Sequence, residues 1–523
     1  MSGVHERGPD EGGAPTATAA TSAPTALSAR IAEVLAIDPS APAIEFAGAW
    51  RAWGELAATV DAVAALVPAP GAEIGVILRN RPAHVGAVLG ILRAGGCVVT
   101  INPHRGEART RDDIAGLPLD VLVGTTDDLA TFVTDSVTAT LVALDDLGAG
   151  PTVTAGTATT EPSGEAGVAI RMLTSGTTGP PKRIELTYAT MERVLLDAKH
   201  YEKDKGTAAR LRSGVAVVNS PLVHLGGLFR ILQCVNDGRS FALLERFTVD
   251  GWYEAVRRHR PATASLVPAA LRMVLEADLD PEELSSLRSI ISGTAPLSPD
   301  DADAFYEKYG VPVLISYAAT ELGGGVAGWN LRDHERFWKE KRGSVGRVHP
   351  GSELRVVDEE TGDVLGPDEP GLLEIKASQL GRDSGWVHTT DLARIDGDGF
   401  LYILGRADQA IIRGGFKVLP DTVRAAIEAN PAVRGASVVG IDDRRLGAVP
   451  VAAVELKDGH GEVTAEDLID ELGTRLAPYE VPTAITIVDE LPRTDSGKVD
   501  LMAIRALFAS IDEKDWSSGV EGR

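Results

Sequence analysis

A short segment rich in hydroxyl groups and glycine has the composition of a phosphate-binding loop. It comprises Thr174, Ser175, Gly176, Thr177, Thr178 and Gly179, followed by two prolines and Lys182. Glycines allow the backbone to approach a ligand closely, hydroxyls and successive N–H groups can surround phosphate oxygens, and the lysine supplies positive charge. The alternative is a flexible linker. Linkers rarely end in Pro-Pro-Lys between two strand-like runs, so the segment predicts phosphate binding, although it differs from the GxxxxGK[ST] pattern.

Three further residues have types suited to a nucleotide site. Glu321 follows a strand-like run and offers the hard oxygen that Mg²⁺ prefers. Tyr317, four residues earlier, has a ring that can stack on a base. Asp391 carries two acceptor oxygens, which suit a pair of hydroxyl donors. Taken alone, Glu321 is equally compatible with a surface position at a strand end.

Two other candidates have structural interpretations that are common in proteins. His224 lies in an apolar run, where a histidine is more often a satisfied core residue than a ligand. Lys498 lies near the C-terminus, where a lysine is usually solvated. Lys498 nevertheless belongs to a segment framed by Pro492 and Gly497, and this favours a specific loop.

The elements that must position these residues follow an α/β pattern. Strand-like runs at 74–78 and 97–101 flank a helix-like run at 85–92, which predicts layers with mainly parallel strands. Further along, Ser298-Pro299 predicts a helix start and Gly310 its end, before a buried strand at 311–316.

The chain of 523 residues is too long for one ordinary core, so at least two domains are expected. Residues 1–26 are rich in Ala, Thr, Ser, Gly and Pro and are predicted to form a disordered tail. Gly405-Arg406-Ala407-Asp408 forms a polar joint between two apolar strands. We therefore predict an N-terminal domain over 27–407 and a C-terminal domain over 408–523.

Composition restricts the partners. The net charge of −24 argues against nucleic acid and anionic membranes as partners. There is no apolar stretch long enough to span a bilayer and no secretory signal pattern. The two cysteines, Cys97 and Cys234, lie in apolar runs and predict buried thiols in a reducing, cytoplasmic environment. Nothing in the sequence indicates an oligomeric state.

The segment from Thr174 to Lys182 resembles the signature of the adenylate-forming superfamily, and the other segments follow in the order expected for that superfamily. The superfamily contains acyl-CoA and aryl-CoA synthetases, beetle luciferases and nonribosomal peptide adenylation domains. The resemblance runs from about Pro42 to Arg505 and rests on at least five separate motifs. It implies a large N-terminal domain of stacked α/β layers and a small, mobile α+β C-terminal domain.

The resemblance also implies roles for individual residues. The loop from Thr174 to Lys182 would position the outer phosphates of ATP, and Thr320 would contact the α-phosphate. Glu321 would hold Mg²⁺, Asp391 would bind the ribose, and Lys498 would be the catalytic lysine of adenylation. Other nucleotide contacts would come from Gly293, Thr294, Ala295, Pro296, Tyr317, Ala318, Ala319 and Arg406.

Further roles concern the acid and the acceptor. His224, Gly226, Gly227 and Ala318 would bind the acid. Gly414, Gly415 and Lys417 would line a tunnel for the coenzyme A arm, and Asp408 would be the hinge. Five apolar residues near His224 suggest a hydrophobic monocarboxylate: Leu222, Val223, Leu225, Leu228 and Phe229.

The resemblance implies ATP-dependent activation of a carboxylic acid, with Mg²⁺, followed by thioester formation with coenzyme A. Two residues replace a usual glycine of the family pattern: Ala318, which should narrow the pocket slightly, and Thr390. Four further departures, Arg183, Thr422, Arg424 and Ala448, leave the acceptor less certain than the adenylation. The alternatives are another acceptor, such as an amine or a carrier-protein thiol, or a nitrogen oxyacid in place of the carboxylic acid. A non-catalytic nucleotide-binding homologue is a third possibility, against which the joint presence of Lys182, Glu321, Asp391 and Lys498 argues.

Overall fold

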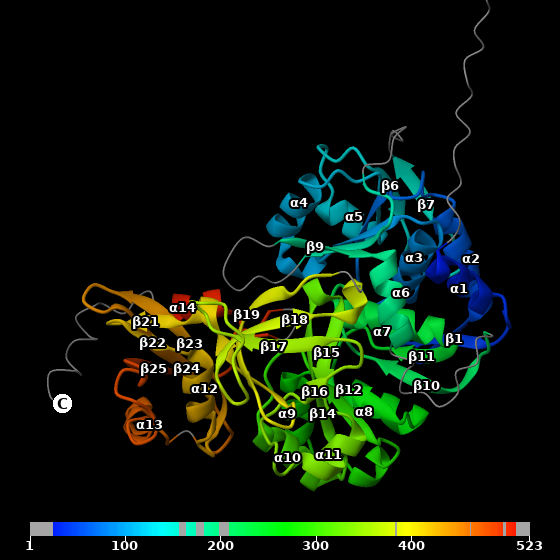
Figure 1. Cartoon of the computed structure of the whole chain (residues 1–523). Helices are drawn as coiled ribbons and strands as arrows, with labels where there is room; N and C mark the ends of the chain where they lie inside the picture. The colour runs from blue at the N-terminus through cyan, green and yellow to red at the C-terminus, as the bar shows by residue number, and fades with distance from the viewer. Residues whose placement is uncertain are drawn as a thin grey trace, which may run out of the picture.

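The hydrophobic clusters divide the protein between residues 403 and 411. The computed structural model describes residues 25–155, 164–173, 182–197, 209–381, 384–460, 462–494 and 498–508. Within these ranges, four clusters consist of residues up to 403 and two consist of residues from 411 onwards. No cluster of described residues contains side chains from both groups, so the two units have separate cores. Figure 1 shows the small C-terminal unit, in orange and red, next to the large unit.

A seven-stranded sheet forms the centre of the large unit. Its inner strands pair in parallel, and the outermost strand at each edge is antiparallel to its neighbour. The spatial order is β7 (Thr152–Ala155), β6 (Thr140–Ala143), β5 (Val121–Gly124), β3 (Glu73–Ile77), β4 (Cys97–Ile101), β8 (Val168–Leu173) and β9 (Arg183–Thr187).

Helices cover both faces of this sheet, because successive side chains of a strand point to opposite faces. In β3, Ile74 and Val76 join one core and Ile77 joins the other. The first face carries α1 (Ala26–Leu35), α2 (Trp53–Ala64), α3 (Pro82–Arg93), α6 (Tyr188–Asp197) and α7 (Leu225–Asn236). The second carries α4 (Glu107–Ala115) and α5 (Thr126–Phe132).

Two further sheets extend the large unit. The first is ordered β10 (Arg212–Val218), β11 (Arg239–Leu243), β1 (Pro42–Phe46) and β2 (Ala49–Ala52). The second is ordered β12 (Thr263–Ser265), β13 (Ser289–Ser292), β14 (Val313–Ala319), β15 (Gly324–Gly328) and β16 (Arg347–Val348). Around the second lie α8 (Val249–His259), α9 (Pro268–Glu276), α10 (Pro299–Tyr309) and α11 (Leu331–Phe337).

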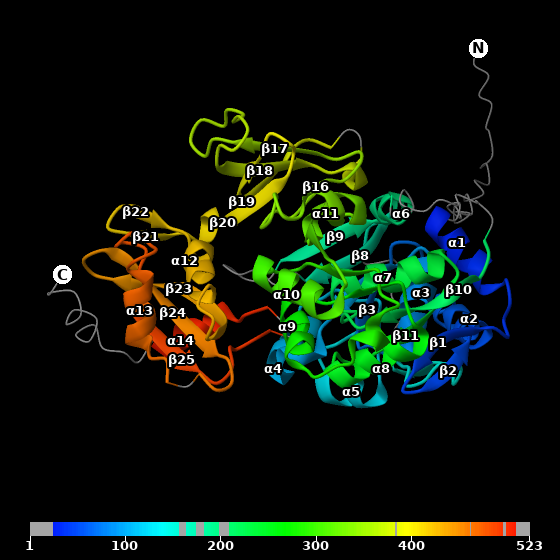
Figure 2. The same cartoon turned by 90° about the horizontal axis from the view of Figure 1, so that it is seen from below.

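An antiparallel sheet leads from the large unit to the small one. It comprises β17 (Glu353–Val357), β18 (Gly371–Lys376), β19 (Val387–Ile395) and β20 (Leu401–Arg406). Strand β20 ends at the joint, beside the C-terminal unit (Figure 2).

The C-terminal unit is an α+β sandwich. Its sheet comprises β22 (Phe416–Val418), β21 (Ile411–Arg413), β24 (Gly447–Leu456) and β23 (Val433–Asp443), with β25 (Ala484–Val488) paired to β24. Its helices are α12 (Pro420–Glu428), α13 (Ala465–Leu472) and α14 (Leu501–Phe508).

Ion pairs connect the two units. Arg272 of α9 contacts Asp301 at 2.7 Å within its own unit and reaches Glu428 of the C-terminal unit at 3.8 Å. Arg434 contacts Glu276 at 2.8 Å. Lys417 also forms an ion pair with Glu359. The described contacts across the joint therefore include several charged pairs, in contrast to the apolar cores on either side.

The local predictions from capping residues are confirmed. Ser298 caps α10, its hydroxyl accepting from the Asp300 N–H at 3.2 Å, and Gly310 ends the helix in the left-handed conformation at φ 68°. Helix α1 starts at Ala26, one residue before the predicted start of the folded chain, and the rest of the predicted tail, residues 1–24, lies outside the described residues. Cys97 and Cys234 are buried free thiols. In the described ranges, no helix is long and apolar enough to cross a membrane.

Candidate active site

Tyr317 and Asp391 face each other from two different sheets. The Tyr317 hydroxyl, on β14, donates a hydrogen bond to the Asp391 carboxylate, on β19. Burial raises the pKa of Asp391. Burial, followed by the nearby Asp391 charge, also raises the pKa of Tyr317. A carboxylate in such a poorly solvated place is stabilised by hydrogen-bond donors.

Arg406 lies directly beside Asp391 at the end of β20, where the two residues are cross-strand partners. Its guanidinium group forms two hydrogen bonds with Asp408, at 2.9 and 2.7 Å. These bonds raise the pKa of Arg406. The last strand of the large unit is thus connected to the joint by a bidentate ion pair, whose planar geometry is specific.

Lys498 enters the same region from the C-terminal unit. The Thr494 N–H donates to the Lys498 carbonyl at 2.7 Å, and Arg493 and Val499 form a bridge across this loop. Burial and then the positive charge of Arg406 lower the pKa of the lysine, whereas Glu321 opposes the shift. These influences place the ammonium group within electrostatic range of Arg406 and Glu321.

His224, at the start of α7, is also subject to the charge of Lys498. Burial, and then the charge of Lys498, lower the pKa of His224 to about 4, so its imidazole is neutral at neutral pH. The His224 N–H closes a turn by donating to the Pro221 carbonyl at 3.1 Å, and the residue caps α7. Its Nε2 is buried and has no hydrogen-bond partner among the described residues. A buried imidazole nitrogen without a partner favours a site for a polar ligand.

The two glycines after His224 differ in their surroundings. A Cβ atom on Gly227 would lie 2.2 Å from the Pro221 carbonyl oxygen, so the turn itself requires glycine there. Gly226 is exposed and has open space around it. Room for an acyl group would therefore come from Gly226.

The segment after β13 has an unusual backbone. A Cβ atom on Gly293 would lie 2.9 Å from the Ser316 carbonyl oxygen of the neighbouring strand. Thr294 adopts a left-handed φ of 71°, which is strained for a residue with a Cβ. Ser292 has a buried hydroxyl oxygen without a partner in the described structure. Ala295 and Pro296 complete this loop, half-buried and exposed respectively.

Ala318, Ala319, Thr320 and Glu321 follow Tyr317 along the chain. The register of β14 against β15 shifts between Tyr317 and Ala318, and a short 3₁₀ helix over Thr320–Leu322 carries Glu321 to an exposed position. The charge of Glu321 acts on both Arg406 and Lys498. Charge interactions therefore link Lys498 of the C-terminal unit with Arg406, Glu321 and His224 of the large unit.

The sequence over residues 31–383 matches the family model described as AMP-binding enzyme. The chain belongs to this family. Residues 423–498 match a second model, the AMP-binding enzyme C-terminal domain. The match extends through both units and confirms the resemblance to adenylate-forming enzymes.

Curated relatives of this AMP-binding enzyme include CoA ligases. It is 30% identical to 4-coumarate–CoA ligase-like 3 from Arabidopsis thaliana over 63% of this chain and 61% of the relative. It is 32% identical to 2-succinylbenzoate–CoA ligase from Bacillus subtilis over 63% of this chain and 66% of the relative. The matched region thus spans less than two thirds of each relative.

Solved structures confirm the predicted fold, a large N-terminal and a small C-terminal unit. ATP-bound MatB from Rhodopseudomonas palustris superposes with a TM-score of 0.78 at 25% identity, over 92% of this chain and 99% of that chain. The amide bond synthetase McbA from Marinactinospora thermotolerans has a TM-score of 0.76 at 24% identity, over 92% of this chain and 100% of that chain, and shares the fold.

Part of the predicted site of the AMP-binding enzyme cannot be placed. Thr174, Ser175, Gly176, Thr177, Thr178 and Gly179 lie outside the described residues. Lys182 is described, is exposed and directly precedes β9. The strands on both sides of the loop, β8 and β9, pair with each other, so the loop connects two neighbouring strands.

Gly414 and Gly415 form the turn of the β21–β22 hairpin. Their φ angles are +59° and +90°, as a tight turn of this hand requires. Both residues are exposed, as is Lys417. Lys417 forms an ion pair with Glu359, and the Gly414 N–H donates to the Leu446 carbonyl at 2.7 Å. The contacts described for these predicted coenzyme A residues are therefore with residues other than Lys498.

The departures from the family pattern have structural explanations at three positions. Arg183 forms an ion pair with Asp113 at 2.7 Å and donates to the Thr100 carbonyl at 3.0 Å. Arg424 pairs with Glu428 at 2.6 Å, and Ala448 packs against the core of the C-terminal unit. No described contact explains Thr390 or Thr422 in particular.

The apolar residues near His224 are mainly core. Leu222, Val223 and Leu228 are buried in the core beside the seven-stranded sheet, which accounts for their hydrophobicity. Leu225 and Phe229 are only partly buried. An apolar wall facing the acid is thus reduced to these two of the five residues that the sequence suggested.

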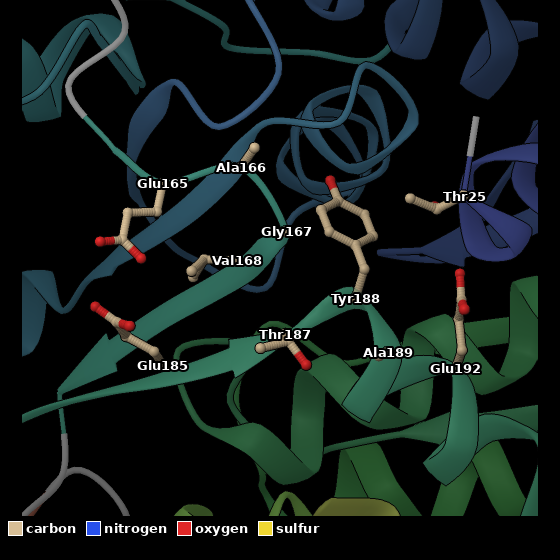
Figure 3. Close-up of a pocket in the computed structure, with 10 residues that line it drawn as sticks. All are labelled: Thr25, Glu165, Ala166, Gly167, Val168, Glu185, Thr187, Tyr188, Ala189 and Glu192. Atoms are coloured by element: carbon tan, nitrogen blue, oxygen red, sulfur yellow. The ribbon is translucent and has the colours of Figure 1, made fainter. Parts of the chain in front are cut away.

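A separate pocket of about 610 Å³ lies beside β8, β9 and the start of α6 (Figure 3). Three glutamates line it, Glu165, Glu185 and Glu192, and its described lining contains no Lys, Arg or His. Carboxylates repel phosphate, so this pocket is unsuitable for a nucleoside triphosphate such as ATP. The cluster around Lys498 remains the candidate active site.

The lowered pKa of Lys498 predicts a pH dependence. Only the ammonium form can stabilise a phosphate, so kcat/KM for ATP should fall as pH rises through a pKa below the ordinary 10.5. In Lys498→Arg this basic limb should move to higher pH, because a guanidinium group stays protonated. Initial rates of pyrophosphate release across pH would measure both profiles, and an identical basic limb in the two enzymes would contradict the assignment.

Proposed function

We propose that the protein is an AMP-forming acid–CoA ligase. It activates a carboxylic acid as an acyl-adenylate and then transfers the acyl group to coenzyme A. The observation that supports the proposal is the hydrogen bond between Tyr317 and Asp391 beside Arg406, close enough to Lys498 for the Arg406 and Glu321 charges to act on that lysine. The curated relatives, of which the matched region spans 61–66%, support a CoA ligase by their names.

The first half-reaction joins the acid to AMP. A carboxylate oxygen attacks the α-phosphorus of ATP, the bond to the bridging oxygen breaks, and pyrophosphate leaves. A carboxylate is already a nucleophile at neutral pH, so the chemistry requires alignment and stabilisation of charge rather than a general base. Lys498 and Thr320 would stabilise the α-phosphate, Lys182 and its loop would hold the outer phosphates, and Asp391 would bind the ribose.

Mg²⁺ fits this arrangement through Glu321. The described residues contain no group of three or more His, Cys, Asp or Glu that could enclose a metal ion. Mg²⁺ commonly binds through one or two carboxylates together with water and phosphate oxygens. The exposed Glu321 carboxylate provides such a ligand, and the bound ion would neutralise phosphate charge.

Glu321→Gln should therefore impair adenylation severely. The variant keeps the shape of the side chain but removes its charge. Loss of groups that merely support a metal ligand costs about 10–100-fold in affinity, so loss of the ligand should cost at least about tenfold. Pyrophosphate release measured across Mg²⁺ concentrations should show partial recovery at high Mg²⁺. The exposed Glu335 of α11 supplies the control Glu335→Gln. Wild-type turnover of Glu321→Gln at ordinary Mg²⁺ would contradict the assignment.

The second half-reaction transfers the acyl group. The thiol sulfur of coenzyme A, on losing its proton, attacks the carbonyl carbon of the anhydride, and AMP leaves. We propose that the C-terminal unit turns about Asp408 for this step and brings Gly414, Gly415 and Lys417 to the anhydride. The separate cores of the two units and the exposed hairpin support this movement.

The substrate is proposed to be a small, apolar monocarboxylic acid. Leu225 and Phe229, which lie in the first turns of α7 after His224 and are only partly buried, support an apolar group at this position. The curated relatives named for coumarate and succinylbenzoate support a small carboxylic acid in general.

Acid-dependent exchange of labelled pyrophosphate into ATP tests the first half-reaction. A panel of aliphatic and aromatic acids should include at least one that supports exchange. Mass spectrometry with coenzyme A, with an amine, or with neither then identifies the acceptor. An amide without thioester would reject coenzyme A as acceptor, and no exchange with any acid would reject the ligase function.

A further inference from the structure

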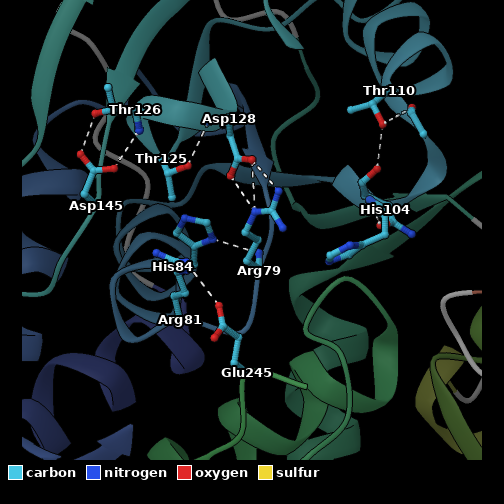
Figure 4. A network of polar contacts seen from close by, with 12 residues as sticks. Arg79, Arg81, His84, His104, Thr110, Thr125, Thr126, Asp128, Asp145 and Glu245 are labelled. Carbon is cyan, nitrogen blue, oxygen red and sulfur yellow. Dashed lines mark hydrogen bonds and ion pairs between the residues drawn. The ribbon is translucent and has the colours of Figure 1, made fainter. Parts of the chain in front are cut away.

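Three consecutive polar residues connect the β3–α3 loop to different parts of the large unit. Arg79 forms a bidentate ion pair with Asp128, with contacts of 2.9 and 2.7 Å, and its backbone N–H donates to His84 Nδ1 at 2.9 Å (Figure 4). Arg81 pairs with Glu245 at 3.3 Å. These contacts fix the backbone on both sides of residue 80.

Asn80, between the two arginines, is 5% exposed and fully engaged. Its side-chain amide donates to the carbonyl oxygens of Ser220 at 3.0 Å and Leu244 at 2.9 Å. Its side-chain oxygen accepts from the Leu222 N–H at 2.7 Å. The two carbonyl groups need donors and the N–H needs an acceptor. The amide group of asparagine supplies both, whereas an ionised carboxylate can only accept.

Two of the three main-chain groups that bind the Asn80 side chain belong to the turn that precedes His224. Ser220 and Leu222 flank Pro221, whose carbonyl accepts from the His224 N–H at 3.1 Å. The His224 carbonyl in turn accepts from the N–H groups of Gly227 and Leu228, in the first turn of α7. The position of the imidazole therefore depends on a turn fixed from the side by one buried amide.

We propose that Asn80 is a positioning residue for acid binding, acting through His224. This inference rests on the proposed function, in which His224 borders the acid. Asn80 holds the turn so that the buried imidazole keeps its orientation, with its unpartnered Nε2 available to a ligand. Phosphate and ribose binding depend on other elements, so the effect of Asn80 is confined to the acid.

Asn80→Ala tests this inference through the KM values of the two substrates. The substitution leaves two carbonyls and one N–H without their side-chain partner, which costs enough to displace the turn. We expect the KM for the acid to rise about tenfold or more, whereas the KM for ATP stays near the wild-type value. The relative rates with different acids should also change. Asn80→Ser, which retains one hydroxyl, should lie between wild type and Asn80→Ala.

Asn236 supplies a matched control. It is 8% exposed, lies at the far end of α7, and its amide contacts Asp237 at 3.3 Å. Asn236→Ala should leave the ratio of the two KM values unchanged. A double-mutant cycle adds a second readout, since residues that act through one another are not additive. In a His224→Ala background, Asn80→Ala should cost little more in the KM for the acid.

Two results would overturn the role of Asn80 while wild type remains active: equal changes in both KM values, or additivity with His224→Ala. If Asn80→Ala does not fold, the same criteria apply to Asn80→Ser. Absence of acid-dependent pyrophosphate exchange in the wild-type protein would overturn the proposed function and this inference together.

Discussion

Lys498→Ala is expected to lose at least about a hundredfold in acyl-adenylate formation. A positioned charge at the developing negative charge of a transition state contributes roughly 3 kcal/mol or more, which corresponds to about two powers of ten in rate. Lys498 belongs to the C-terminal unit, and its charge adds to the burial that lowers the pKa of His224. The charges of Arg406 and Glu321 in turn affect the pKa of Lys498. Single-turnover formation of the adenylate would measure the loss.

The same variant should still convert a supplied acyl-adenylate to the thioester, because the proposed rotation has moved Lys498 away by that step. Lys457→Ala is a suitable control, since this lysine is exposed on the same unit and donates to the Pro431 carbonyl at 2.9 Å. Equal losses in both half-reactions of Lys498→Ala would contradict the proposed rotation.

Asp408→Pro should have the opposite effect to Lys498→Ala: adenylation should continue, and thioester formation should fall. Asp408 lies in a 3₁₀ turn over Ala407–Gln409, a conformation whose φ of roughly −50 to −70° is compatible with proline. The observed arrangement, with Lys498 at the site, should therefore persist and pyrophosphate exchange should continue. A second arrangement that needs another φ would cost about 3 kcal/mol, so thioester formation should fall about a hundredfold.

The ion pair with Arg406 requires a control for this variant. Asp408→Ala removes the two contacts of 2.9 and 2.7 Å but leaves φ free. It should affect both half-reactions alike, whereas Asp408→Pro should affect mainly the second. Both assays would be run on one folded preparation of each variant. Normal thioester formation by Asp408→Pro would show that the chain turns elsewhere.

Much of the fold could be predicted because its signals are local. The strand over Cys97–Ile101 is an apolar run between turn residues, and the structure has it at the same residues. The helix after Ser298-Pro299 starts and ends at residues whose backbone preferences are fixed by their own chemistry. The family motifs pointed to Lys498 and Glu321, but their proximity depends on how two separately folded units meet.

The role proposed for Asn80 could not be predicted from the sequence, because its hydrogen-bond partners are main-chain groups. Asn80 has an informative position, directly between two arginines and just before a proline-led helix, but its three partners are main-chain groups distant in sequence. Main-chain groups are the same at every residue, so no pattern of residue types points to them. Leu222 and Val223 were predicted to line the acid pocket, but both are buried in the core. Their apolar side chains alone could not distinguish the two positions.

The separate cores on the two sides of Asp408 also determine how the proposed rotation responds to temperature. Changes in heat capacity arise chiefly from the hydration of apolar surface. No apolar cluster of the described chain is divided by the joint, and the contacts found there include the pairs Arg272–Glu428 and Arg434–Glu276. Rotation should then carry a heat-capacity change far smaller than that of unfolding. The free-energy difference between the two orientations would then vary nearly linearly with temperature, without the curvature that marks the free energy of unfolding.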